Sequence, residues 1–238
     1  MKTYRSGRIY SAQQVKEYTK THKLPYRTLA YRDFPTLTKK FAPIHTVLDV
    51  GTGTGCSANY LHESGYNVVG VDSSPAMLQQ SRTNFPHIPF FHTKALQLSF
   101  QFDLAFSCFM ILEQAHKQII INHFNQAAAA LKDNGIFFAV TASEELYNRE
   151  RNWAYFNVDY SKNTSPSSGN IVKASLKDPA MNFYDFFWTE NDCKECFEAS
   201  NLKLLEIHHP LGLASEPYPW ADELTISPFV IFIAQKIS

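Results

Sequence analysis

The sequence of 238 residues predicts a doubly wound α/β fold with a mostly parallel sheet. The first observation is that short apolar runs alternate with helix-like segments from Pro43 onward. The second is that these runs are apolar on both faces, which is typical of strands inside a parallel sheet. The third is a glycine-rich turn at residues 51–55, directly after the first run. Such a turn between a strand and a helix can hold a nucleotide-sized ligand.

The expected elements follow one another along the chain. Strands are predicted at residues 47–50, 68–71, 89–92, 104–108, 136–140, 202–208 and 229–235, where apolar runs are bounded by turn residues. Helices are predicted at residues 58–64, 75–84, 119–131 and 189–200, the last with Thr189 as its N-cap. Residues 10–41 are expected to be helical and broken at Pro25 and Pro35.

Length and composition favour one domain with additions. We expect a helical N-terminal cap at 1–42, a ligand-binding core at 43–142, an insert at 143–187 and the closing part of the sheet at 188–238. The insert is rich in aromatic residues around a Ser/Pro/Gly centre. Two interpretations stay open for it: an extra strand pair that pads the sheet edge, or a lid over the substrate.

Charge is balanced overall but uneven along the chain. The first 46 residues hold ten Lys and Arg against Glu17 and Asp33, so a net +8 there is offset by −8 in the remainder. This arm could attract an anion or nucleic acid, but it has no run of five like charges, and a solvated helical face is the favoured interpretation. Four cysteines, no secretory apolar segment and no apolar stretch of about 18 residues predict a cytoplasmic protein with no membrane partner.

Cys193 and Cys196 form a C-x-x-C pair. No second pair follows, and both residues lie in a predicted helix. We therefore favour two ordinary helix positions and expect no metal.

The glycine-rich turn has the form D-x-G-x-G-x-G from Asp49 to Gly55. A dinucleotide-binding turn counted from Gly51 would need a small residue at position 56, which is Cys56. Asp72 ends the next predicted strand, 21 residues past Gly51. A carboxylate about 20 residues past the first glycine is expected to accept the ribose hydroxyls of a nucleoside.

This pattern resembles the first motif of class I S-adenosylmethionine-dependent methyltransferases. Residues 47–140 follow the order of that family, and residues 188–236 are similar to the close of its small-molecule members. The resemblance implies a Rossmann-like methyltransferase fold of seven strands with a reversed last strand, a helical N-terminal extension and an inserted lid-like segment.

The resemblance also implies a site for S-adenosyl-L-methionine, whose product is S-adenosyl-L-homocysteine. Its methionine end would lie on the glycine turn, its ribose at Asp72 and its sulfonium beside Ser107. Lys94 stands where many members carry an acidic residue for adenine, so backbone groups nearby are expected to contact the base. The expected cofactor-binding residues are Asp49, Gly51, Thr52, Gly53, Gly55, Asp72, Ser73, Met77, Ala95, Leu96 and Ser107.

The leading hypothesis is methyl transfer to a small-molecule acceptor that contacts Trp153 and His209. No catalytic residue is assigned; the candidate bases are His208, His209, Glu113 and His116. The sequence does not indicate an oligomeric state.

Three alternatives stay open. The basic N-terminal arm favours an RNA methyltransferase. The departure at Lys94 would suit a module that binds the cofactor without catalysis. An NAD-linked oxidoreductase is disfavoured by Cys56.

Overall fold

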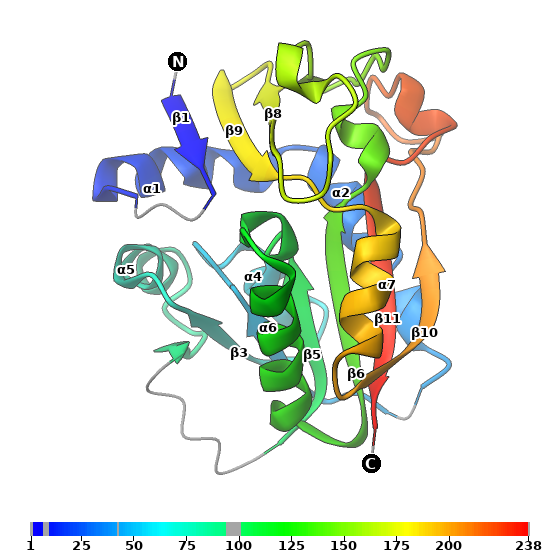
Figure 1. Ribbon diagram of the computed structural model, residues 1–238. Coiled ribbons are helices and arrows are strands. Elements are labelled where there is room, and N and C mark those ends of the chain that lie inside the picture. The colour runs from blue at the N-terminus through cyan, green and yellow to red at the C-terminus, as the bar shows by residue number, and fades with distance from the viewer. Residues whose placement is uncertain (1, 7–9, 42, 94–100, 238) are drawn as a thin grey trace.

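The computed structural model describes residues 2–6, 10–41, 43–93 and 101–237 (Figure 1). In these ranges the chain forms a seven-stranded sheet in the order β10-β11-β6-β5-β2-β3-β4 and a separate four-stranded sheet in the order β1-β9-β8-β7.

The large sheet is mostly parallel. Its strands are β2 (Thr46–Val50), β3 (Asn67–Asp72), β4 (Phe90–His92), β5 (Phe102–Cys108), β6 (Leu131–Ala142), β10 (Leu202–His208) and β11 (Phe229–Lys236). Strand β11 runs antiparallel to both of its neighbours, β6 and β10, and the other adjacent pairs are parallel. The predicted doubly wound sheet with a reversed last strand is confirmed.

Helices cover both faces of this sheet. Helices α6 (Lys117–Ala130) and α7 (Glu190–Glu198) cover one face, where Phe124 and Phe197 stack with their ring centroids 4.4 Å apart. On the other face lie α4 (Cys56–Glu63), α5 (Pro75–Asn84) and the N-terminal helices. Helix α7 begins at a capping box in which the Thr189 side chain accepts from the Asp192 amide, so the predicted N-cap is confirmed.

The N-terminal segment is not wholly helical. It contains α1 (Ala12–Tyr18), the 3-10 turn η1 (Thr19–Lys23), α2 (Tyr26–Tyr31) and α3 (Phe34–Thr38). Before them comes the strand β1 (Lys2–Arg5), which pairs in parallel with β9 (Met181–Phe186). The expected helices between residues 10 and 41 are therefore present, and a short strand that the sequence did not indicate precedes them.

Residues 143–187 contribute the rest of the small sheet. Strands β8 (Ile171–Leu176) and β9 form an antiparallel hairpin, and β7 (Phe156–Asn157) pairs with β8. An extra strand pair was one of the two interpretations of the insert. The β8–β9 pair does not extend the edge of the large sheet, however, because it pairs with β1 and β7 in a separate sheet.

The small sheet lies over the carboxyl ends of the large sheet's parallel strands (Figure 1). The turn η3 (Ile111–Glu113), which follows β5, contacts β9. The N-terminal segment and the insert thus meet above the edge where ligands of open α/β sheets bind. None of the helices in the described ranges has the length and apolar character needed to cross a membrane.

Candidate functional site

The loop after β2 is shaped by glycines with positive φ. Gly51, Gly53 and Gly55 have φ of 75°, 54° and 90°, a region that side chains disfavour. The Gly51 and Thr52 amides donate to the Val71 carbonyl at 2.9 and 3.0 Å, which holds the loop against β3. A Cβ built on Gly53 would meet no atom within 4 Å. The loop is therefore held against β3 through Gly51 and Thr52, and at Gly53 it is open to a ligand.

Asp72, at the carboxyl end of β3, lies directly beside this loop. One carboxylate oxygen accepts from the Gly53 amide at 2.9 Å, and the other accepts from the Ser74 amide at 2.8 Å. Burial raises the pKa of Asp72, and the backbone donors act in the opposite direction. These bonds fix the carboxylate at the loop, where its oxygens can also accept from a ligand hydroxyl.

Three buried polar atoms gather at the ends of β2 and β5. Asp49 is wholly buried, and its Oδ2 accepts from the Ser57 hydroxyl at 2.7 Å. Its Oδ1, the Thr52 hydroxyl and the Ser107 hydroxyl are buried without a hydrogen-bond partner, and in the described ranges only one other side-chain atom shares this condition. Unsatisfied buried oxygens are costly, so their concentration here fits a polar ligand.

A cavity of about 40 Å³ lies against the glycine loop. This is room for a few water molecules or one small polar group. Its wall comes from three parts of the chain, whose lining residues are Tyr18, Arg27, Tyr31, Gly51, Thr52, Gly53, Thr54, Cys56, Ser57, Cys108 and Phe109.

The N-terminal helices form a part of the cavity wall that was not predicted from the sequence. Tyr18, Arg27 and Tyr31 face a loop that begins at least 20 residues further along the sequence. His22 strengthens this contact, because its Nε2 lies 2.6 Å from the Thr54 hydroxyl. The signal that could have found it was the cluster of Tyr and Arg in residues 10–41.

Most of the expected cofactor-binding residues lie along one edge. Asp49, Gly51, Thr52, Gly53, Gly55, Asp72 and Ser107 lie at the carboxyl ends of β2, β3 and β5 or in the loop between β2 and α4. Ser73 follows β3 directly, and Met77 is buried in the first turn of α5. Ala95 and Leu96, with Lys94, lie outside the described residues.

The structure places the two expected substrate residues elsewhere. Trp153 is 0% exposed in the core, and its indole N–H donates to the Leu146 carbonyl at 3.0 Å. It reaches neither the cavity nor the surface, so its surroundings are those of a packing residue. His209 is exposed, with its Nε2 2.9 Å from a Glu190 carboxylate oxygen, and it does not line the cavity.

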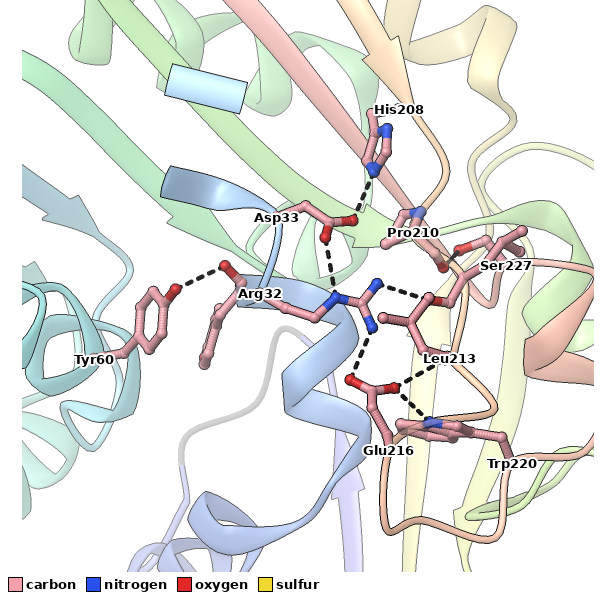
Figure 2. Close-up of polar contacts among 11 residues, drawn as sticks. Arg32, Asp33, Tyr60, His208, Pro210, Leu213, Glu216, Trp220 and Ser227 are labelled. Atoms are coloured by element: carbon pink, nitrogen blue, oxygen red, sulfur yellow. Dashed lines mark hydrogen bonds and ion pairs between the residues drawn. The ribbon is translucent and has the colours of Figure 1, made fainter. Parts of the chain in front are cut away.

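The candidate bases are likewise separate from the cavity. His208 Nε2 lies 2.8 Å from Asp33, which also accepts from Arg32 (Figure 2). Glu113 belongs to η3 and His116 is an exposed N-cap of α6; neither lines the cavity.

The order of the seven strands, the reversed last strand and the glycine loop facing an acid at the end of β3 define a Rossmann-like methyltransferase fold. A solved S-adenosylmethionine-dependent methyltransferase from Clostridium acetobutylicum has the same fold, with a TM-score of 0.65 and 14% identity over 95% of this chain and 100% of that chain. Residues 47–135 match the family described as a methyltransferase domain. Within residues 47–135 the chain is thus similar to methyltransferase domains, and its fold is that of solved S-adenosylmethionine-dependent methyltransferases.

Curated methyltransferases also match parts of the chain by sequence. An uncharacterized methyltransferase of Synechocystis is 31% identical over 140 residues, which cover 57% of this chain and 58% of the relative. An 18S rRNA (guanine-N(7))-methyltransferase of Bos taurus is 54% identical over 35 residues, which cover 15% of this chain and 12% of the relative. The matches thus span less than two thirds of these relatives.

Proposed function

We propose that the protein binds S-adenosyl-L-methionine at the Gly51–Gly55 loop and transfers its methyl group to a small-molecule acceptor. The observation that carries the proposal is the Gly51–Gly55 loop, open at Gly53, with the Asp72 carboxylate fixed beside it by the Gly53 and Ser74 amides. A carboxylate next to a glycine loop at the carboxyl ends of parallel strands suits the ribose of a nucleoside ligand.

The bound cofactor supplies a methyl group on a positively charged sulfur, so the protein has to align and shield the reactants. In our proposal Asp72 accepts hydrogen bonds from the ribose, and its two backbone bonds hold it in place for that task. Phe109 and the phenols of Tyr18 and Tyr31 exclude water from the loop. Burial raises the pKa of both phenols, so they remain neutral at physiological pH.

We place the acceptor between the loop and the small sheet, with residues 1–42 and 143–187 closing over the 43–142 core. The position of the small sheet over the carboxyl ends supports this arrangement (Figure 1). The acceptor residues are left unassigned, because Trp153 is buried in the core and His209 is bound to Glu190.

The basic N-terminal arm favours a small acceptor over RNA, because many of its cations are buried or paired with carboxylates. Arg27 is buried, and Arg32 is bound to Asp33 and Glu216. Further pairs join Lys2 and Lys20 to Glu17 and Lys40 to Glu206. About half of the arm's ten cations are thus buried or paired with carboxylates of the same chain, which leaves less charge for a phosphate backbone. The short likeness to an rRNA methyltransferase keeps RNA as the second candidate.

Two measurements test the proposal. In a thermal-shift comparison, adenosylmethionine and adenosylhomocysteine should raise the melting temperature and NAD should not, because a ligand at 100 times its Kd stabilises the folded state by about 2.7 kcal/mol. With labelled cofactor and a cell extract, the label should enter low-molecular-weight products that survive ribonuclease. Label lost with ribonuclease would support the RNA alternative, and binding without transfer to any acceptor would support a non-catalytic module.

A further inference from the structure

Asp185 is a buried carboxyl on the inner face of the small sheet, and its hydrogen-bond partners among the described residues are neutral. The residue is 6% exposed and lies on β9, where strand alternation puts it on the same face as the core residues Met181 and Phe183. Its Oδ2 accepts from the Tyr147 hydroxyl at 2.9 Å, and its Oδ1 accepts from the Ser6 hydroxyl at 3.4 Å. Both bonds position the carboxyl, and neither supplies a positive charge.

Asp192 shows how the same chain compensates another buried carboxylate. It is also 6% exposed, but it pairs with Lys117 at 2.6 Å and accepts from the Thr189 amide at 2.9 Å. Against the effect of burial, these groups lower the pKa of Asp192 to about 2, whereas burial and the charge of Glu113 raise the pKa of Asp185 to about 7. Within the described ranges, no Lys, Arg or His forms an ion pair with Asp185. A buried carboxylate without a counter-charge suits a cationic ligand.

The inner face of β9 lies above the edge of the large sheet where the proposed function places the reaction. The small sheet covers the carboxyl ends of the parallel strands (Figure 1), and β9 contacts the turn η3 that follows β5. Phe183 packs edge-on against Tyr18, which is in the cavity wall at the glycine loop, with the ring centroids 6.2 Å apart. Since alternate residues of a strand lie about 7 Å apart, a small acceptor at this wall can reach both Phe183 and Asp185.

The titratable groups described around Asp185 come from three elements: Tyr147 from η4, Glu113 from η3 and Tyr10 ahead of α1. Burial, followed by the charges of Glu113 and Asp185, raises the pKa of Tyr10. Burial likewise raises the pKa of Tyr147. Both phenols therefore stay protonated at physiological pH and can donate hydrogen bonds, and the carboxylates are the groups that can take a proton.

We propose that the methyl acceptor is a small amine whose ammonium group binds Asp185, and that Asp185 takes its proton before transfer. The proposal rests on the proposed function, because it names the class of acceptor for the same site. An alkylamine is protonated at physiological pH, as the Lys side chain is with its ordinary pKa of about 10.4, and in that form its nitrogen has no free lone pair. A base whose pKa lies near the working pH is suited to removing this proton.

The proposed step moves one proton and one methyl group. The proton leaves the ammonium nitrogen for a carboxylate oxygen of Asp185, and the freed lone pair forms a bond to the methyl carbon. The bond from that carbon to sulfur breaks with its electron pair on sulfur, which becomes a neutral thioether. The acceptor becomes a methylated ammonium, and Asp185 returns its proton to water. Tyr147 is a positioning residue here, because its hydrogen bond stabilises the charged form of Asp185.

A purely structural Asp185 is the competing explanation. Its two hydrogen bonds would then only join β1 and η4 to β9. The two explanations differ in the chemistry of the methylated product, in the affinity for an amine and in the pH dependence of transfer, because a structural residue sets none of these.

The first experiment uses the wild-type protein, adenosylmethionine labelled in its methyl group and the low-molecular-weight fraction of a cell extract. Labelled products are separated from the unreacted cofactor, and fragmentation in a mass spectrometer locates the methyl group. We expect it on an amine nitrogen. A methyl group on oxygen, carbon or sulfur would overturn the proposal, and no variant has to fold for this result. The absence of any labelled product would instead contradict the proposed function.

The second experiment measures binding without turnover. Calorimetry gives the Kd of the amine identified in this way for the protein saturated with adenosylhomocysteine. Asp185→Asn should raise this Kd ~10- to 100-fold, as expected for the loss of a charge-assisted hydrogen bond. Asp159→Asn is the matched control, because Asp159 is an exposed carboxylate of the same insert that pairs with Arg149, and it should leave the Kd unchanged. The Kd of adenosylhomocysteine should stay within about threefold in every variant, which reports that each is folded.

The pH profile of kcat/KM separates proton removal from binding alone. In the wild type it should rise with pH and level off above about pH 7, because the carboxylate form of Asp185 is needed. Asp185→Asn should lower kcat/KM ~100-fold or more and remove this rise. Tyr147→Phe removes a bond that lowers the pKa of Asp185, so the rise should move to higher pH. Unchanged profiles in both variants, an unchanged Kd for the amine in Asp185→Asn, or loss of adenosylhomocysteine binding in that variant would make Asp185 a structural residue and overturn the proposal.

Discussion

Asp72 binds two backbone amides, and this gives its substitution two consequences. Asp72→Ala removes the proposed ribose acceptor and also releases the Gly53 amide from its partner. We expect the affinity for adenosylhomocysteine to fall ~10- to 100-fold in calorimetry, because charge-assisted hydrogen bonds are lost. Asp103 provides a matched control: its carboxylate also accepts two backbone amides, those of His45 and Thr46, but at the opposite edge of the sheet. Asp103→Ala should lower stability and leave the Kd unchanged, and an unchanged Kd in Asp72→Ala would remove the ribose assignment.

Asp49 gives the free energy of unfolding a pH dependence of defined sign. Burial raises the pKa of Asp49 from its ordinary value of 3.8 to about 6. The protonated Asp49 carboxyl is therefore favoured more in the folded protein than in the unfolded chain. Its contribution to the free energy of unfolding is complete below about pH 4 and is lost as the pH rises through 6. Two pKa units correspond to on the order of 3 kcal/mol. In urea unfolding, Asp49→Asn should gain stability over the wild type by up to this amount between pH 4 and pH 7.

Asp103→Asn should show the opposite trend. Its bonds to Lys132 and to backbone amides hold the pKa of Asp103 below its usual value, so its contribution to stability is present at neutral pH and lost on acidification. Parallel pH profiles for the wild type and Asp49→Asn would contradict the raised pKa of Asp49.

At the scale of elements, the predictions succeeded where the determining contacts are local. The apolar runs and the glycine turn identified β2, β3 and the loop between β2 and α4, because these signals lie within a few residues of one another. Strand β1 was missed, because its four residues include two charges and its partner β9 lies about 180 residues away. Arg27 was assigned to a solvated basic face for the same reason: its burial comes from distant loops that charge patterning does not report.

Trp153 shows how an aromatic residue in a lid-like segment can instead belong to the core. We expect Trp153→Ala to lower the free energy of unfolding by about 3–5 kcal/mol, because a fully buried side chain is removed from a packed cluster. Trp153→Phe keeps most of the volume and loses the bond to Leu146, which should cost about 1–3 kcal/mol. Denaturant unfolding measures both values. Wild-type stability in Trp153→Ala together with a raised KM for an acceptor would return this residue to the substrate site.

At the scale of the whole molecule, the two parts that cover the carboxyl ends form one sheet. Strand β1 comes from the N-terminus and β7, β8 and β9 from the insert, so neither part can move freely while the β1–β9 pairing lasts. The N-terminal part also reaches the cofactor loop, through Arg27 in the cavity wall and through His22 at Thr54. We therefore expect a ligand at the loop to act on the insert through the N-terminal helices and the β1–β9 pairing.

This connection predicts a joint response in hydrogen exchange. On addition of adenosylhomocysteine, amides of α1, α2, β1 and β9 should gain protection together, because a ligand that ties the N-terminal helices to the loop raises the free energy of opening for everything paired with them. Arg27→Gln should reduce this gain in β9 although Arg27 lies far from β9 in the sequence, and Arg32→Gln should not. Amides of α7 serve as an internal reference, because α7 packs on the opposite face of the large sheet. Protection confined to the Gly51–Gly55 loop and β3 would mean that the small sheet is a fixed cover that does not respond to the cofactor, and the closing role proposed for residues 143–187 would then be withdrawn.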